Sequence, residues 1–355
     1  MTKFKSKQIH IDKAIAGMQL SKAILTDEGK VALTEGTLLS RSLVERLRSW
    51  GITHIAICEG VEDTGPSFMP PSPQQEFFDI YEGTVNTVKK AFETIRTLKT
   101  IPIGEVNSLV SQAINPMLQS SGVINHLHMV RRQDDYTFHH SVNVAVIAGV
   151  LGKWLGLDDL ELRHLTLAGL LHDVGKTQIP LHILNKPGKL SEDEMQIMKQ
   201  HTALGFQIVK RIRGIPATVR YGVLQHHEKM DGSGYPLNFT SDKIHLFAKI
   251  ISVADIYDAM TSDRVYHRKV SPFEVVEMML KEMYNKLDPT VCNVFLNNVR
   301  DYFWGNLVEL SNGQVAEVVY LGHFIGSRPV VRTMAGEFID LEKRKDYCIK
   351  RLVKT

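Results

Sequence analysis

The spacing of apolar and polar residues along the chain changes character twice. In residues 1–60, short alternating runs such as ITHIAI predict strands, and SRSLVERLRSWG predicts one short helix. Over residues 77–303 the patterns are helical, and after residue 304 two pairs of strand-like runs return, one pair joined by Asn312-Gly313 as in a β-hairpin. The chain is therefore predicted to be mainly α, a helical bundle with a small α+β N-terminal domain and a short C-terminal β-hairpin appendage.

Composition places the borders between these parts. The stretch EDTGPSFMPPSPQQ holds four prolines, which indicates a linker. Within the helical part, Ser191 and Ser271 each stand three residues before a glutamate, as in a capping box at a helix start. The expected parts are an α+β domain at 1–61, a Pro-rich linker at 62–76, connecting helices at 77–130, a helical domain at 131–303 and a β appendage at 304–355.

Charge and cysteine content narrow the classes of function. The 355-residue chain has a formal net charge of +3, too small to favour DNA or a membrane surface as a partner. Its three cysteines form no CxxC pair, which suits a reducing compartment and offers no thiolate metal site. No apolar run reaches membrane-spanning length, and no signal peptide is recognised. We expect a cytoplasmic protein.

Histidines and aspartates gather in helical segments among apolar neighbours. Any one of them could be a buried, hydrogen-bonded core residue. Burying seven ionisable groups together is costly unless something compensates them, and divalent metal does so. The seven candidate ligands are His140, His172, Asp173, His201, His226, His227 and Asp255.

The types and number of these ligands indicate the kind of centre. Five imidazoles and two carboxylates suit iron, manganese, nickel, cobalt or zinc better than calcium. Seven ligands exceed what one such ion takes, so a binuclear centre is expected, with Asp173 bridging the ions and a metal-activated hydroxide attacking a phosphate ester. Lys176 follows His172 by four residues, on the same helix face, and could neutralise a phosphate. The alternative is a solvated surface lysine.

Two motifs carry a family resemblance. HDVGK at 172–176 and HHEKMDGSGYP at 226–236, supported by HHSVNVA, LNKPGKLSEDE and VADIYDAMTSDRVYHR, resemble the HD-GYP proteins, a subgroup of the HD-domain metal-dependent phosphohydrolases. The resemblance covers about residues 130–300. It implies a helical HD domain that hydrolyses the bacterial second messenger cyclic di-GMP to linear pGpG, and in some members onward to GMP.

The resemblance also implies roles for individual residues. The implied metal ligands are the same seven, and Lys176 would contact the scissile phosphate. Arg264 would contact the substrate, unless it serves a structural ion pair. The GSGYP turn would lie beside the site, where Gly234, Tyr235 and Pro236 could shape the pocket or dock a partner such as a diguanylate cyclase. Glu228, Asp231 and Asp258 are interpreted as groups that orient ligands or end helices.

One position departs from part of the family. Some members have a glutamate four residues before the first ligand histidine and bind a third metal, whereas this chain has Tyr136 there. Asp134 and Asp135 have the wrong spacing for the same helix face. We therefore expect two divalent ions per chain, iron or manganese by analogy.

Several alternatives remain open at this stage. The substrate could be another cyclic dinucleotide, such as cyclic GMP–AMP. The domain could also be a silent signalling module, although the loss of ligands or of the lysine that would mark one is not found. The helices of 77–130 could pair two copies into a homodimer or pack on the helical domain of their own chain.

Overall fold

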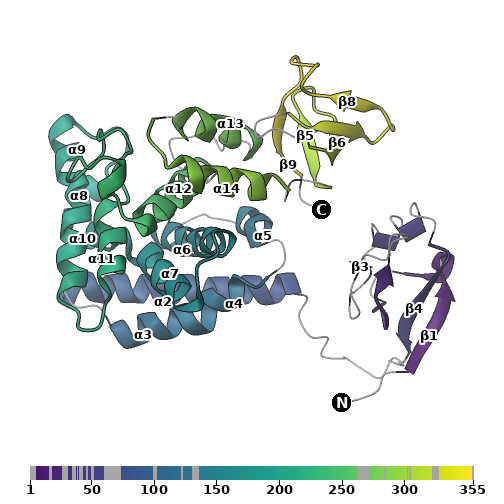
Figure 1. The fold of residues 1–355 in the computed structure, drawn as a ribbon, viewed down its shortest axis with the longest axis horizontal. Coiled ribbons are helices and arrows are strands. Elements are labelled where there is room, and N and C mark those ends of the chain that lie inside the picture. Colours follow the sequence, from purple (N-terminus) through teal and green to yellow (C-terminus); the bar gives the residue numbers. More distant parts are fainter. Residues whose placement is uncertain are drawn as a thin grey trace. The chain divides into compact units, whose positions relative to one another are not determined.

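The computed structural model describes residues 5–353 except 16–17, 26–30, 34–36, 38, 40–42, 45–46, 49–51, 60–72, 99–101, 121–122, 130–135, 262–271, 284, 302, 304 and 322–327. Two compact units make up the chain, Met1–Pro70 and Pro71–Thr355, and each is described by itself (Figure 1). The residues that carry the candidate chemistry all lie in the second unit.

The first unit is built from short antiparallel strands. β1 (Lys5–His10) pairs with β4 (His54–Glu59), and β2 (Ile24–Leu25) pairs with β3 (Val31–Leu33), while the 3-10 turn η1 (Ile11–Lys13) follows β1. Strand β4 confirms the strand predicted from ITHIAI, and its Ile55 and Ile57 face a small core of their own. The helix predicted before it lies partly outside the described residues.

The second unit is helical up to its C-terminal sheet. Short 3-10 and π turns connect the longer helices at several of the corners. In chain order the elements are α2 (Pro73–Leu98), α3 (Ile103–Leu109), η2 (Val110–Ile114), α4 (Asn115–Met117), α5 (Val123–Met129), α6 (Tyr136–Trp154), α7 (Asp159–Leu171), η3 (Val174–Gln178), α8 (Leu181–Leu184), α9 (Glu192–Lys199), α10 (His201–Lys210), α11 (Ala217–Gln225), η4 (Ser241–Lys243), α12 (Leu246–Thr261), α13 (Pro272–Met283) and α14 (Pro289–Asp301).

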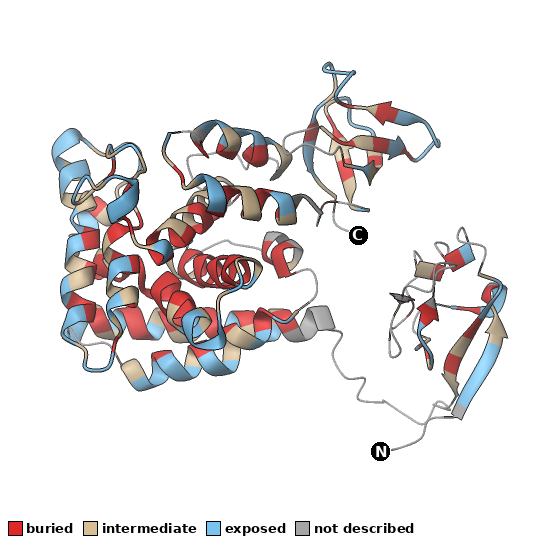
Figure 2. Ribbon diagram, in the orientation of Figure 1, coloured by how far each residue is buried: buried red, intermediate tan, exposed pale blue. Residues whose placement is uncertain are grey.

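Helix α6 is the centre of this bundle. Every residue over 139–152 is buried, and the helix packs against α2, α7, α12 and α14 (Figure 2). A helix that is apolar all round can be stable only when other elements cover it on all sides. The first candidate ligand, His140, therefore enters the structure from the most deeply buried helix of the unit.

Helix α2 packs on the bundle from Phe77 to Ile95. Its buried residues recur at three- and four-residue intervals, from Phe77 and Tyr81 through Val88 to Ile95, and the opposite face is exposed. The stripe contacts α6 and η3 of the same chain. Helix α2 thus packs on the helical domain of its own chain, and the pairing of two copies into a homodimer stays a prediction.

Local signals in the sequence set several helix starts. At α9 the Ser191 hydroxyl accepts from the Glu194 amide at 3.2 Å, and the Glu194 carboxylate accepts from the Ser191 amide at 2.7 Å, which confirms the predicted capping box. Asp158 and Glu161 form a second box at α7. The box predicted at Ser271 lies outside the described residues, although α13 begins at Pro272.

The C-terminal part is an antiparallel sheet with strand order β8-β7-β6-β5-β9. The two predicted hairpins are present, β5 (Leu307–Leu310) with β6 (Val315–Tyr320) and β7 (Val330–Thr333) with β8 (Phe338–Asp340). β9 (Ile349–Leu352) pairs with the free side of β5, so the appendage is a five-stranded sheet with its own core.

These findings confirm the predicted fold class. A helical bundle is preceded by a small strand-containing domain and followed by an antiparallel sheet. Among the described residues, none of the helices combines the length and the hydropathy that crossing a bilayer requires.

Candidate metal centre

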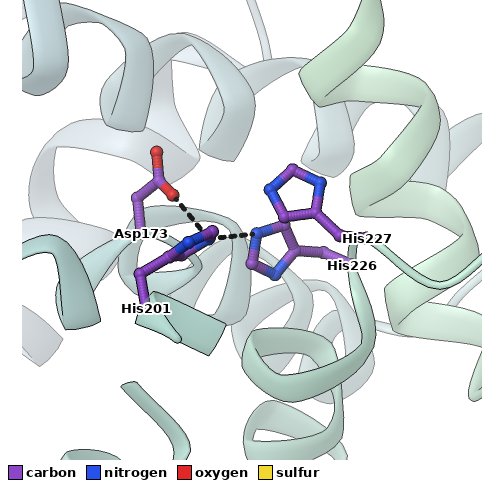
Figure 3. A group of neighbouring side chains, drawn as sticks. All are labelled: Asp173, His201, His226 and His227. Atoms are coloured by element: carbon purple, nitrogen blue, oxygen red, sulfur yellow. Dashed lines mark hydrogen bonds and ion pairs between the residues drawn. The ribbon is translucent and has the colours of Figure 1, made fainter. Parts of the chain in front are cut away.

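The structure brings all seven predicted ligands into one place, although they come from five regions of the chain. Their ligand atoms form two groups, within each of which the atoms lie within 4.8 Å of one another. One group holds His140 from α6, His172 and Asp255 from α12. The other holds Asp173, His201, His226 and His227, whose side chains point toward one another in Figure 3.

Helix ends place most of these side chains. His172 is the C-cap of α7, Asp173 precedes η3, His201 begins α10, and His226 is the C-cap of α11. At a helix end the chain changes direction, so neighbouring residues such as His226 and His227 can both reach the same site. A Cβ on Gly175 would overlap the carbonyl oxygen of His201, so the glycine of HDVGK allows η3 to lie directly on α10.

The centre is buried on one side and open on the other. His140, His172, Asp173, His201 and His226 are at most 2% exposed. The side chains of Asp255 and His227 are 13% and 27% exposed, and that of Lys176 is 25% exposed. A ligand from solvent would therefore reach the cluster past these three residues.

Asp173 lies between the two groups. Its Oδ1 is 3.3 Å from His201 Nε2, whereas its Oδ2 is 3.3 Å from His172 Nε2 and 3.7 Å from His140 Nε2. The two carboxylate oxygens thus face different groups of imidazoles. The Oδ2 atom also lies 2.5 Å from Lys176 Nζ.

The outer nitrogens of four imidazoles are already occupied. Nδ1 of His172, His201 and His226 donates to the backbone carbonyls of Gly169, Met198 and Val223, at 2.7, 2.8 and 2.9 Å. Nδ1 of His140 lies 2.7 Å from Asp258 Oδ2. These bonds fix the rings so that each Nε2 faces the cluster.

Two buried atoms in the cluster have no hydrogen-bond partner, His172 Nε2 and Asp173 Oδ1. Buried polar atoms in folded proteins are nearly always hydrogen-bonded or bound to an ion. The donors around them are imidazole nitrogens and carboxylate oxygens, which suit first-row divalent metals. The residues present therefore fit a metal centre.

Electrostatics leaves most of the cluster in the protonation state that metal binding needs. Burial lowers the pKa of His201 to about 4 and that of His227 to about 3, and it holds the pKa of His226 well below 6.5. Burial opposes ionisation of both carboxylates, but Lys176 and His172 outweigh it and keep the pKa of Asp173 low. At Asp255 the hydrogen bond and charge of His140 do the same. Burial also acts on His140, but its hydrogen bonds to Asp255 and Asp258 outweigh it and raise its pKa to about 9.

The metal-free protein is expected to be most stable near pH 6.5. Below this pH the unfolded chain protonates histidines that stay neutral in the folded chain, with pKa values of about 4 for His201 and about 3 for His227, so stability falls by up to about 1.4 kcal/mol per pH unit for each. His140 has the opposite sign, because its contribution is complete below pH 6.5 and is lost as the pH rises to about 9.

Thermal melts of chelator-treated protein at pH 5.0, 6.5 and 8.5 check this dependence. The His227→Gln variant is the control, because removing one of the low-pKa imidazoles should flatten the fall on the acid side. A melting temperature that rose steadily from pH 6.5 to pH 5.0 would contradict the assignment of these buried histidines as neutral.

The GSGYP turn lies against the ligand pair His226-His227. The ring of Tyr235 is centred 4.8 Å from that of His227, and a Cβ on Gly234 would overlap the backbone of Glu228 and Lys229. Glu228 accepts hydrogen bonds from the amides of Leu237 and Phe239, at 2.6 and 2.9 Å, which ties the loop down. The Tyr235-Pro236 peptide bond is cis.

The remaining residues named from the sequence either lie outside the described part of the chain or support the site without belonging to the cluster. Arg264 and the pair Asp134-Asp135 lie outside the described residues. Tyr136 stacks on the His140 ring, with centroids 5.5 Å apart. Asp231 accepts from the amide and hydroxyl of Ser233 and shapes the turn, whereas Asp258 orients His140.

Three residues that contact the site were missed in the sequence. Asn143 donates to Asp258 at 2.6 Å, and Tyr81 of α2 donates to Asn143 at 2.8 Å. Arg96, also on α2, donates to the carbonyls of Lys176 and Ile179. Asn143 could have been found from its position one helical turn after His140, whereas nothing near Tyr81 or Arg96 in the sequence points to the site.

Comparison with known families agrees with this geometry. Residues 123–291 match the family described as the HD domain. The match begins at α5, so helices α2 to α4 lie outside it.

The curated proteins that resemble the chain include two that hydrolyse different cyclic dinucleotides, by their printed names. A cyclic di-GMP phosphodiesterase of Pseudomonas aeruginosa is 35% identical over 65% of this chain and 56% of its own length. A 3'3'-cGAMP-specific phosphodiesterase of Vibrio cholerae is 34% identical over 51% of this chain and 42% of its own length. The chain thus spans about half the length of these relatives.

The structure of an HDG"Y"P protein from Bdellovibrio bacteriovorus superposes with a TM-score of 0.54, at 18% identity, over 83% of this chain and 99% of that one. At this level of identity the likeness concerns the fold, which the two chains share.

Proposed function

We propose that the chain is a metal-dependent phosphodiesterase that hydrolyses cyclic di-GMP to linear pGpG. The observation that carries the proposal is the position of Asp173 between two groups of imidazoles, with Lys176 beside it on the open side of the cluster. Hydrolysis at a two-metal site uses ligands divided between two ions, and a cation beside them can neutralise charge on the substrate phosphate.

The seven residues of the cluster would hold two divalent ions, iron or manganese, with Asp173 as the ligand that lies between the two groups. Bound there, the ions would supply an acidified water and neutralise charge on the phosphate oxygens. The absence of a carboxylate at position 136, where the aromatic ring of Tyr136 stacks on His140, supports two ions over three.

The chain's own residues have separate tasks around this centre. The ammonium group of Lys176 lies beside Asp173 on the open side of the cluster, where it would contact the scissile phosphate. Tyr235, held against His227, would line one wall of the substrate pocket together with Gly234 and Pro236. The buried faces of α6 and α12 exclude water from the other side of the cluster.

A second candidate substrate is 3'3'-cGAMP. The relative from Vibrio cholerae whose printed name specifies this dinucleotide matches about half of the present chain. The scissile bond and the metal chemistry would be the same for both substrates, so the difference must come from contacts to the second base.

The test joins metal analysis to a product assay. The protein is purified without oxygen, its metals are counted, and each cyclic dinucleotide is supplied at equal concentration with iron or manganese. We expect about two ions per chain and the appearance of pGpG from cyclic di-GMP, with slower loss of 3'3'-cGAMP. Two bound ions without turnover of either dinucleotide would refute the proposed activity, and the amount of GMP formed would show how far hydrolysis proceeds.

A further inference from the structure

A line of buried hydrogen bonds runs from helix α2 to the candidate ligand His140. The Tyr81 hydroxyl donates to Asn143 Oδ1 at 2.8 Å, and Asn143 Nδ2 donates to Asp258 Oδ1 at 2.6 Å. The other carboxylate oxygen of Asp258 lies 2.7 Å from Nδ1 of His140. Tyr81 and Asn143 are fully buried and Asp258 is 2% exposed, so water does not replace these partners.

Which group donates and which accepts in each of these hydrogen bonds is fixed by the neighbouring bond. Because Asn143 turns its amide nitrogen to Asp258, its amide oxygen faces Tyr81, and an oxygen can be satisfied only by a donor. The tyrosine hydroxyl is that donor. It also lies 3.1 Å from Nδ1 of His139, which can donate to it. Without the hydroxyl, the Asn143 amide would lose the contact that keeps its nitrogen toward Asp258.

The hydrogen bond between Asp258 and His140 sets the orientation of the His140 ring in the cluster. Asp258 holds the proton of His140 on Nδ1, so Nε2 is directed to the centre, 3.1 Å from Asp255 Oδ1 and 3.7 Å from Asp173 Oδ2. We infer that Tyr81 is a positioning residue of the metal centre, which sets the orientation of His140 through Asn143 and Asp258.

The inference assigns a role to a helix outside the matched HD domain, which begins at residue 123. α2 runs past α6 and reaches η3, where Arg96 donates to the carbonyls of Lys176 and Ile179 at 3.0 and 3.3 Å (Figure 1). The same helix thus contacts the turn that bears Lys176 and the residues that hold His140. The functional unit therefore begins at α2, and the inference rests on the metal centre proposed above.

Titration of metal-free, full-length protein with Mn²⁺ tests the inference without relying on turnover. Tyr81→Phe is expected to weaken one of the two Mn²⁺ sites about tenfold or more, the effect typical of losing a group that orients a ligand, and to leave the other unchanged. In an Asp258→Asn background the same change should add less than about twofold, because the line is already broken.

Two variants serve as controls. Tyr221→Phe removes a hydroxyl from an exposed tyrosine on α11 and should leave both sites unchanged. Val88→Ala removes buried packing from α2 without touching the hydrogen bonds, so it should lower the melting temperature but keep the Mn²⁺ affinity.

The outcomes separate the inference from the proposed function. Wild-type affinity in Tyr81→Phe, equal weakening by Val88→Ala, or additive effects of Tyr81→Phe and Asp258→Asn would each overturn the role of Tyr81 while the metal centre stands. A wild-type protein that binds neither Mn²⁺ nor Fe²⁺ would overturn the metal centre itself and the inference with it. Tight Mn²⁺ binding without turnover would refute the activity alone.

Discussion

Asp173→Asn is expected to lower cyclic di-GMP turnover about a thousandfold or more and to reduce the bound metal. The carboxylate is 1% exposed and faces imidazoles from both groups of ligands, so its charge has no substitute within reach. The amide keeps the volume of the side chain but supplies neither the charge nor a second oxygen for bridging. Metal content by elemental analysis and initial rates by chromatography measure the two effects.

The matched control for this change is Asp242→Asn. Asp242 lies on the short turn η4, is exposed and accepts a hydrogen bond from the Thr240 hydroxyl, so the variant loses one negative charge that is not part of the cluster. It should retain wild-type metal content and turnover. An Asp173→Asn protein that kept two ions and full activity would show that the bridge has been assigned to the wrong carboxylate.

Lys176→Met is expected to lower kcat by about a hundredfold to a thousandfold while the metal stays bound. In the metal-free protein the ammonium group lies 2.5 Å from Asp173 Oδ2, an oxygen of a predicted metal ligand, so removing this group should not weaken the binding of the ions. Methionine preserves most of the apolar stem that packs beside the cluster. The loss should therefore appear in turnover, where a positive charge next to the phosphate is missing.

Lys189→Met is the matched control, because Lys189 is exposed on the loop before α9. It should behave as the wild type in both metal binding and kcat. If Lys176→Met lost its metal together with its activity, the lysine would be needed to hold Asp173 rather than to contact the substrate.

The helical part of the fold and both C-terminal hairpins could be predicted because their signals in the sequence are local. The capping box at Ser191 and the hairpin turn at Asn312-Gly313 each involve residues within a few positions of one another. Strand β9 was not predicted because its partner β5 is some forty residues away and its middle residues are exposed. Such an edge strand carries no alternation that a single sequence can reveal.

In the candidate site, too, some residues could be found from the sequence and others only from the folded chain. The seven ligands could be named because each is an ionisable residue in an apolar helical segment or at its end, and two short motifs hold four of them. Tyr81 gave no such signal, because its partner Asn143 is 62 positions away and a tyrosine in a buried stripe is usually a packing residue. The contact depends on how α2 lies on α6, which only the folded chain defines.

The hydrogen bonds that orient the histidines determine which substitutions the site can tolerate. His172, His201 and His226 each donate Nδ1 to the carbonyl of the residue three positions earlier, and a carbonyl is supplied by any amino acid. Substitutions at Met198 or Val223 would therefore leave these rings oriented as before. His140 instead depends on one carboxylate, that of Asp258. A mutation of Asp258 can therefore change the orientation of His140 while all seven candidate ligands stay in place. The other three rings keep their orientation because their partners are main-chain carbonyls.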